Sequence, residues 1–129
     1  DAMAGDEALI RRYRIDGALQ AAGANLELIQ AIEQLGPFGA GNAQPRFAFP
    51  AAQIINAAPV GENHIRCMIT GESGGRLKAI SFRSLETPLG QALLNTRGLP
   101  LHVCGTLRID RWQGRETPQL TIEDAAAIN

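Results

Sequence analysis

The spacing of hydrophobic residues changes near residue 46, which divides the sequence into a helical part and a strand-rich part. Before this point, Leu28, Ile32 and Leu35 lie at positions i, i+4 and i+7, which is typical of a helix with one apolar face. Asn25 is well placed to cap the N-terminus of this helix, and Gly36-Pro37 ends it. A short strand over 11–16 is expected to precede it.

After residue 46, apolar and polar residues alternate in short runs, as they do in strands with one buried face. We expect five strands, over 46–58, 64–70, 76–83, 101–109 and 119–123. The third run loses its alternation between Leu77 and Ile80, which predicts a β-bulge there. Thr87-Pro88 begins a helix between the third and fourth strands, because proline suits the first helical position.

Three strands, a helix and two further strands are the element order of a small Greek-key barrel of the OB type. We therefore predict a mainly β protein with two parts. A helical arm and a Gly/Pro-rich elbow occupy residues 1–45, and a five-stranded OB-fold barrel occupies 46–129. Ligands of this fold lie on the face of strands 2 and 3 and at the loops joining strands 1–2 and 4–5.

The chain has 129 residues, of which 45% are hydrophobic, enough for one compact domain and too apolar for intrinsic disorder. No run approaches the roughly 18 consecutive apolar residues of a membrane span. The net charge is −1, but eight arginines and Lys78 stand against four acidic residues over 44–115. This basic segment between acidic flanks indicates either a polyanion-binding surface or scattered solvated charge.

Cys67 and Cys104 are the only cysteines, too few for a disulfide framework or a thiolate zinc site. We expect each cysteine to lie on a strand and to pack as a small apolar residue. Free cysteines of this kind suit a protein from a reducing compartment. Because no secretory leader opens the sequence either, we expect a cytoplasmic protein without a membrane partner.

No catalytic constellation is evident in the sequence. The two histidines are 38 positions apart, no serine lies in a G-x-S-x-G elbow, and HxxxH, DxD and DHH motifs are missing. The glycines of 36–41 follow a helix and lack the Gly-Lys-Ser/Thr ending of a phosphate loop, so we interpret them as a structural turn. We expect no catalytic residue, metal site or cofactor in this chain.

A nucleic-acid surface is better supported by the residues. The sole tryptophan, Trp112, lies in a polar loop between arginines, and single-strand binders combine such cations with aromatic faces on which bases stack. The candidates share a position on the ligand side of an OB barrel: His64, Arg66, Arg76, Lys78, Arg108, Arg111, Trp112 and Arg115. The cations would contact phosphates, Trp112 would stack on a base and His64 would add a hydrogen bond.

Other interpretations of these residues remain open. Trp112 could instead be a lid packed over the end of the barrel, and each arginine could be an ordinary solvated residue. We interpret the four phenylalanines as core or elbow anchors rather than stacking platforms. They are Phe38, Phe47, Phe49 and Phe82.

The segment LGPFGAGNAQPRF (35–47) resembles the L-x-PFG-x-GN-P-x-P-x-F signature that opens the C-terminal OB domain of the RecJ family. Later segments agree in order: HIR (64–66), AISF (79–82), LRIDRWQG (107–114) and QLTIED (119–124). The resemblance covers about residues 13–124. Two positions depart from the pattern, because Ala43 replaces a proline and Asp110 replaces an asparagine, and an acid there would repel phosphate.

RecJ proteins are bacterial 5′→3′ exonucleases of the DHH superfamily that act on single-stranded DNA in repair and recombination. The resemblance implies that this chain is the single-stranded-DNA-binding fragment, unable to cut by itself. The parent enzyme would be metal-dependent, using Mg or Mn, and its catalytic domains would be partners of this chain. The alternative is a structural or docking module that braces the nuclease core or binds a partner such as a single-strand-binding protein.

Overall fold

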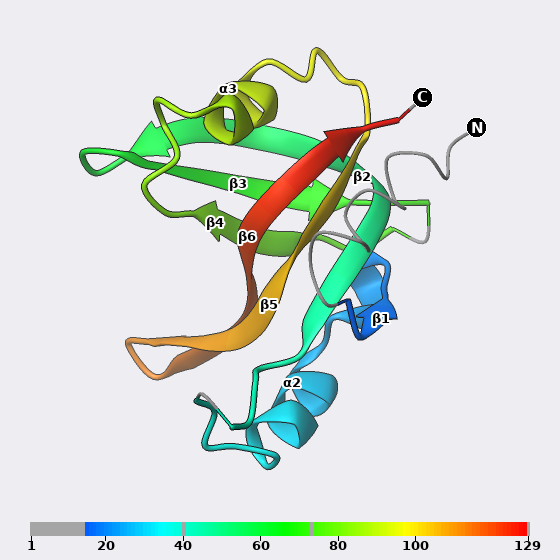
Figure 1. Cartoon of the computed structure of the whole chain (residues 1–129), viewed down its shortest axis with the longest axis vertical. Helices are drawn as coiled ribbons and strands as arrows, with labels where there is room; N and C mark the ends of the chain where they lie inside the picture. Colours follow the sequence, from blue (N-terminus) through cyan, green and yellow to red (C-terminus); the bar gives the residue numbers. More distant parts are fainter. Residues whose placement is uncertain (1–14, 40, 73, 129) are drawn as a thin grey trace.

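Five strands form a closed barrel in the computed structural model, which describes residues 15–39, 41–72 and 74–128 (Figure 1). They are β2 (Arg46–Val60), β3 (His64–Thr70), β4 (Leu77–Ser81), β5 (Leu101–Trp112) and β6 (Arg115–Ala127). The order around the barrel is β2-β3-β4-β6-β5, and β5 pairs back onto β2. Only the β4–β6 pair of this barrel is parallel. The predicted OB-type barrel is therefore confirmed.

The long strand β2 belongs to two parts of the barrel. Its first half pairs with β5, from Arg46 to Ala52, and its second half pairs with β3, from Gln53 to Val60. The register shifts after Phe49 in the first half and after Ile55 in the second, as expected where a strand bends sharply.

The β-bulge predicted within the third strand is wrong. Strand β4 pairs with β3 without a register shift, and Leu77, Ala79 and Ser81 are all buried. The alternation is thus intact, but its inward positions include a serine while Ile80 lies half-buried on the outer side. From polarity alone, Ile80 would face the core and Ser81 the solvent, which is the reverse of what the structure shows. Burial in a small barrel depends on side-chain size as well as on polarity.

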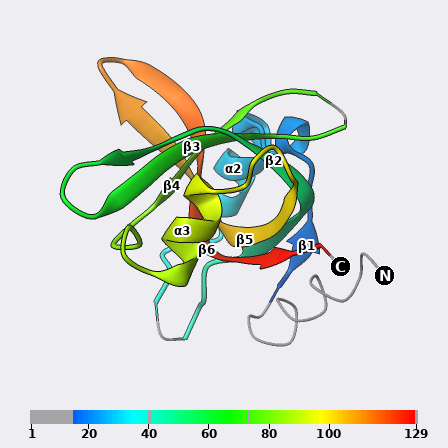
Figure 2. The same cartoon turned by 90° about the horizontal axis from the view of Figure 1, so that it is seen from above.

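Both predicted helices are present, with the predicted N-caps. The Asn25 side chain accepts a hydrogen bond of 2.9 Å from the Leu28 N–H at the start of α2 (Leu26–Glu33). Thr87 Oγ1 accepts one of 3.1 Å from the Gly90 N–H at the start of α3 (Pro88–Leu94). The helices lie at opposite ends of the barrel in Figure 1, and Figure 2 views the barrel from the α3 end.

The N-terminal arm packs onto the barrel. Strand β1 (Gly17–Ala18) pairs in parallel with β2, and the 3-10 helix η1 (Ala21–Gly23) follows it. Ala21 and Ile29 of the arm belong to the same buried cluster as Phe49 of the barrel. The strand expected over 11–16 begins outside the described residues, and its last two residues are not in a strand. No helix of the described chain is long and apolar enough to cross a bilayer.

Candidate functional site

The outer face of β3 and β4 carries four of the residues that bear on function. Ile65 and Cys67 of β3 are buried in the barrel, so the alternating residues His64 and Arg66 face outward. Arg66 is paired with Ile80 of β4, and Lys78 lies one outward position before Ile80 on that strand. Phe82 follows the end of β4 beside His64. This is the strand 2–3 face of an OB barrel.

Strands β6 and β5 extend this face. Lys78 is paired with Gln119 of β6, and Gln119 is paired with Arg108 of β5, so the three form one row across the sheet. Arg108 Nε donates a hydrogen bond of 2.8 Å to Gln119 Oε1. This bond orients the arginine and leaves its charge without a carboxylate partner among the described residues.

The hairpin of β5 and β6 carries the face past the end of the barrel. Gln113 and Gly114 form its turn with φ of 50° and 76°, the left-handed values that a tight two-residue hairpin turn needs. Trp112 and Arg115 are direct cross-strand partners, so both lie on the same side of the hairpin. The indole is 67% exposed. Trp112 is therefore available to a ligand, and the lid interpretation is wrong.

Arg111 lies on the other side of this hairpin. Its Nη2 is 3.0 Å from Glu33 Oε1 on α2, and its Nε is 3.1 Å from Glu116 Oε2. The hydrogen bonds that Arg111 donates, to Glu33 first and then to Glu116, raise the pKa of this guanidinium. The structure therefore separates Arg111 from the other candidates and gives it two carboxylate partners.

Lys78 is also paired, with Asp110 Oδ2 of β5 at 2.5 Å. The hydrogen bond from Lys78 lowers the pKa of the Asp110 carboxyl. The departure from the family pattern at Asp110 thus places an acid beside one of the candidate cations. Arg66, Arg76 and Arg115 are exposed, and no ion pair among the described residues involves them. Arg76 lies in the loop just before β4.

Phe82 is the residue that the sequence interpretation missed. Its ring is 44% exposed rather than anchored in the core, unlike Phe49, which is 1% exposed. The ring packs edge-on against His64, with centroids 5.3 Å apart and planes at 78°, and the Arg108 Cζ is 5.8 Å from its centroid. The strand alternation could have identified it, because buried Ala79 and Ser81 place Phe82 on the outer side.

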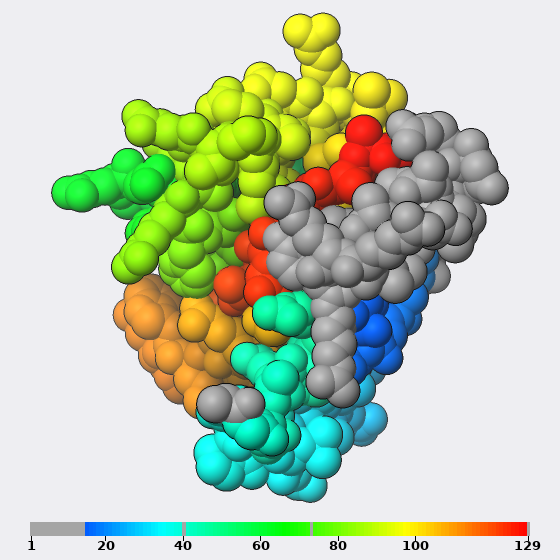
Figure 3. Space-filling model, viewed as in Figure 1, coloured from blue at the N-terminus to red at the C-terminus, as the bar shows by residue number. Residues whose placement is uncertain are grey.

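Seven residues thus share one outer surface, which we call the cationic strip. They are His64, Arg66, Lys78, Phe82, Arg108, Trp112 and Arg115. Register gives their order, from His64 and Phe82 at one end through Arg66, Lys78 and Arg108 to Trp112 and Arg115 at the hairpin. In Figure 3 the orange hairpin projects at the lower left, below the yellow-green residues around α3.

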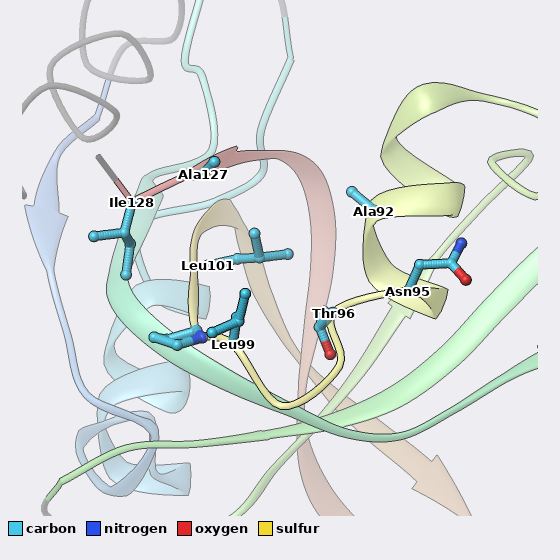
Figure 4. Close-up of a pocket in the computed structure, with 8 residues that line it drawn as sticks. Ala92, Asn95, Thr96, Leu99, Leu101, Ala127 and Ile128 are labelled. Atoms are coloured by element: carbon cyan, nitrogen blue, oxygen red, sulfur yellow. The ribbon is translucent and has the colours of Figure 1, made fainter.

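A second surface feature is an apolar groove of about 430 Å³ at the far end of the barrel from the hairpin (Figure 4). The C-terminal end of α3, the following loop and the end of β6 line it. Leu99 is 68% exposed there, near Leu101 and Ile128. Such a surface suits an apolar protein segment better than a phosphate backbone.

The described residues, 15–39, 41–72 and 74–128, contain no group of three or more His, Cys, Asp or Glu side chains that could hold a metal ion. The cationic strip places cations and exposed aromatic rings on one outer surface, a combination that is typical of proteins that bind single-stranded nucleic acid.

Comparison with known proteins identifies the family and the fold of the chain. The family model described as the RecJ OB domain matches residues 15–124. The chain is similar to the single-stranded-DNA-specific exonuclease RecJ of Bacillus subtilis (strain 168), with 30% identity over 103 residues, or 78% of this chain and 12% of that protein. Its fold is similar to the crystal structure of RecJ in complex with Mn²⁺ from Thermus thermophilus, with a TM-score of 0.66 and 18% identity. That match covers 95% of this chain and 18% of the other.

Proposed function

The chain belongs to the RecJ OB domain family, and from this premise we propose that it is the single-stranded-DNA-binding module of a RecJ-like 5′→3′ exonuclease in DNA repair and recombination. The observation that carries the proposal is the exposed indole of Trp112 on the same outer surface as arginines without carboxylate partners among the described residues. Bases stack on such rings without regard to sequence, and cations contact the phosphates between them.

The roles within the cationic strip follow from the partners of each residue. Arg66, Arg108 and Arg115 contact phosphates, and Arg76 extends this row beyond the start of β4. His64 Nδ1 accepts a hydrogen bond of 2.9 Å from the Arg83 N–H, so the neutral ring carries its proton on Nε2 and donates from there. Lys78 shares its charge with Asp110 and contributes less than the arginines.

Under this proposal, the chain binds single-stranded DNA but does not hydrolyse it. It spans only 12% of the length of the curated relative that it matches. Metal-dependent phosphodiester hydrolysis, with Mg or Mn, belongs to the other domains of the parent protein. The OB module then increases the time that the substrate spends near those domains, which is the expected benefit of a tethered second binding site.

A titration of the single tryptophan with a short oligodeoxynucleotide tests the proposal. We expect Trp112 fluorescence to change on binding, and the logarithm of the affinity to fall linearly with the logarithm of salt concentration, with a slope near −0.7 per phosphate contacted. In an anisotropy assay, Trp112→Ala should weaken binding by about 1–3 kcal/mol. Salt-independent binding, or equal affinity of a folded Trp112→Ala variant, would contradict the proposal.

The apolar groove favours a second candidate function, in which the domain docks onto the rest of its own parent chain. The curated relative is far longer than this chain, so most of that protein lies outside the matched domain. Exposed Leu99 offers an apolar contact for such a partner. An apolar interface responds little to salt, so Leu99→Asp should weaken association with the parent's other domains at any ionic strength.

A further inference from the structure

The cationic strip carries a second exposed aromatic ring at the end opposite the hairpin. We propose that Phe82 is a base-stacking platform, so that a single strand is held by one ring at each end of the strip and by arginines between them. This inference rests on the proposed function and deepens it. The ligand class is an unpaired polynucleotide with its bases present.

The Phe82 ring is held in place before any ligand arrives. The His64 ring packs edge-on against it, with the two ring centroids 5.3 Å apart. His64 is in turn held by the hydrogen bond that it accepts from the Arg83 N–H. Arg83 has a left-handed φ of 54°, which turns the chain directly after the ring. A ring that is both fixed and 44% exposed loses little side-chain freedom when a base stacks on it.

The contact between Arg108 and Phe82 is not close-packed. The Arg108 Cζ lies 5.8 Å from the ring centroid, near the outer limit of a cation–π interaction and well beyond the roughly 3.5–4.0 Å of close carbon–carbon contact. A base that stacks on the ring therefore requires this exposed side chain, which one hydrogen bond joins to Gln119, to move aside. Guanidinium planes are themselves stacking surfaces for bases, so Arg108 can follow the base rather than be lost.

Charges around Phe82 orient the strand. Arg66 and Arg108 lie toward the middle of the strip, and Phe82 also lines a hollow of about 410 Å³ with Glu123 and Asp124. Glu123 is already paired with Arg46 at 2.8 Å, so the attraction of phosphates by Arg66 and Arg108 is the main orienting charge effect. The backbone of the strand therefore runs along the arginine side, and the base lies toward the ring.

The register gives the span between the two rings. Phe82 lies four residues after Lys78, directly past the end of β4, and Lys78 shares a row with Arg108. Trp112 lies four residues beyond Arg108 along β5. At about 3.3 Å per residue, these eight steps correspond to roughly 26 Å along the strip. One nucleotide cannot reach both rings, so the two platforms require a strand of several nucleotides, within the usual site size of an OB fold.

Two substitutions test the role of Phe82. Phe82→Leu keeps an apolar side chain against His64 but removes the π face, and it should weaken binding of a short oligodeoxythymidine by about 5- to 100-fold. Phe82→Tyr keeps the face and should bind within about twofold of the unsubstituted chain. An oligonucleotide with abasic residues offers phosphates but no bases, so its weaker binding should not change in Phe82→Leu.

Leu35→Ala is the matched control, because Leu35 is also an exposed apolar residue and lies just after α2, outside the strip. The inference is overturned if Phe82→Leu binds oligodeoxythymidine as Leu35→Ala does while Trp112→Ala binds more weakly, and the proposed function then stands. It is also overturned if Phe82→Leu weakens abasic and normal strands equally. Failure of the unsubstituted chain to bind either strand would overturn the proposed function itself.

Discussion

Two glycines lie where the backbone leaves no space for a side chain. A Cβ added at Gly105 would be 1.9 Å from the Thr121 carbonyl oxygen across the β5–β6 pair, and one added at Gly90 would be 1.8 Å from the Ser84 carbonyl oxygen. Both contacts are with backbone, which cannot move aside as a side-chain end can. At these positions glycine is required by close packing rather than by a special φ.

Gly105→Ala should therefore lower the free energy of unfolding by about 3 kcal/mol, at the upper end of ordinary overpacking costs. Urea denaturation followed by circular dichroism measures this change. Gly39→Ala is the control, since a Cβ there would meet nothing within 4 Å. Equal stability of the two variants would show that the barrel relaxes around Gly105 far more easily than the structure indicates.

Single residues of the candidate site were predictable only in part. A lone tryptophan between arginines in a polar segment left both a stacking ring and a packed lid open, and only the structure shows that Trp112 is exposed. The aromatic character of Phe82 favoured the core, but its place in the strand alternation puts it outside. The sequence could not show that Arg111 faces Glu33, because these residues are distant in the chain and meet only once the hairpin lies against α2.

The β5–β6 hairpin has two sides with different chemistry, at the scale of an element. Trp112 and Arg115 lie on the side of the cationic strip, and Arg111 and Glu116 are cross-strand partners on the side that faces α2. Because carboxylates already surround Arg111, it releases few counterions from DNA when a strand binds. Arg115 has no such partner among the described residues.

We expect Arg115→Gln to reduce the salt dependence of oligonucleotide binding by about 0.7 in slope, the value for one phosphate contact on a single strand. Arg111→Gln should leave the slope unchanged. Titrations at several salt concentrations provide both slopes, and circular dichroism shows whether each variant is folded. If Arg111→Gln lowers the slope as much as Arg115→Gln does, Arg111 leaves Glu33 to contact DNA.

Elements were predicted best where local contacts determine them. Asn25 and Thr87 each cap a helix through a residue three positions away, so the sequence alone located both helix starts. The parallel β4–β6 pair and the return of β5 to β2 join segments far apart in the chain. Their pairing was inferred from the order of elements in a known barrel type rather than from any local signal.

At the scale of the whole molecule, both cysteines are inaccessible while the barrel is closed. Cys67 and Cys104 are 1% and 0% exposed. Burial raises the pKa of each thiol to about 12, and the nearby Asp124 and Glu123 carboxylates add to the effect at Cys104. Because only the thiolate reacts, a rise in pKa from the ordinary value of 9.0 lowers the reactive fraction near pH 8 by about a thousandfold.

We therefore expect neither thiol of the native protein to react with Ellman's reagent at pH 8 within the time that the urea-unfolded chain takes to react fully. The absorbance of the released thiolate measures both reactions. If the native protein reacts slowly, both thiols should react at the same rate, and that rate should equal the rate of global unfolding. Rapid reaction of one thiol would show that its part of the barrel opens locally.

The pairing of β2 with both β3 and β5 affects how the molecule folds. Its second half meets β3 through a short turn, but Phe47 of its first half pairs with Gly105, more than fifty residues along the chain. The entropy of closing so large a loop must be overcome before that seam contributes any stabilising contact. We therefore expect the β2–β3 hairpin to form early and the pairing of β2 with β5 to limit the folding rate. A slow pairing step would lengthen the lifetime of partly folded chains with unpaired strand edges.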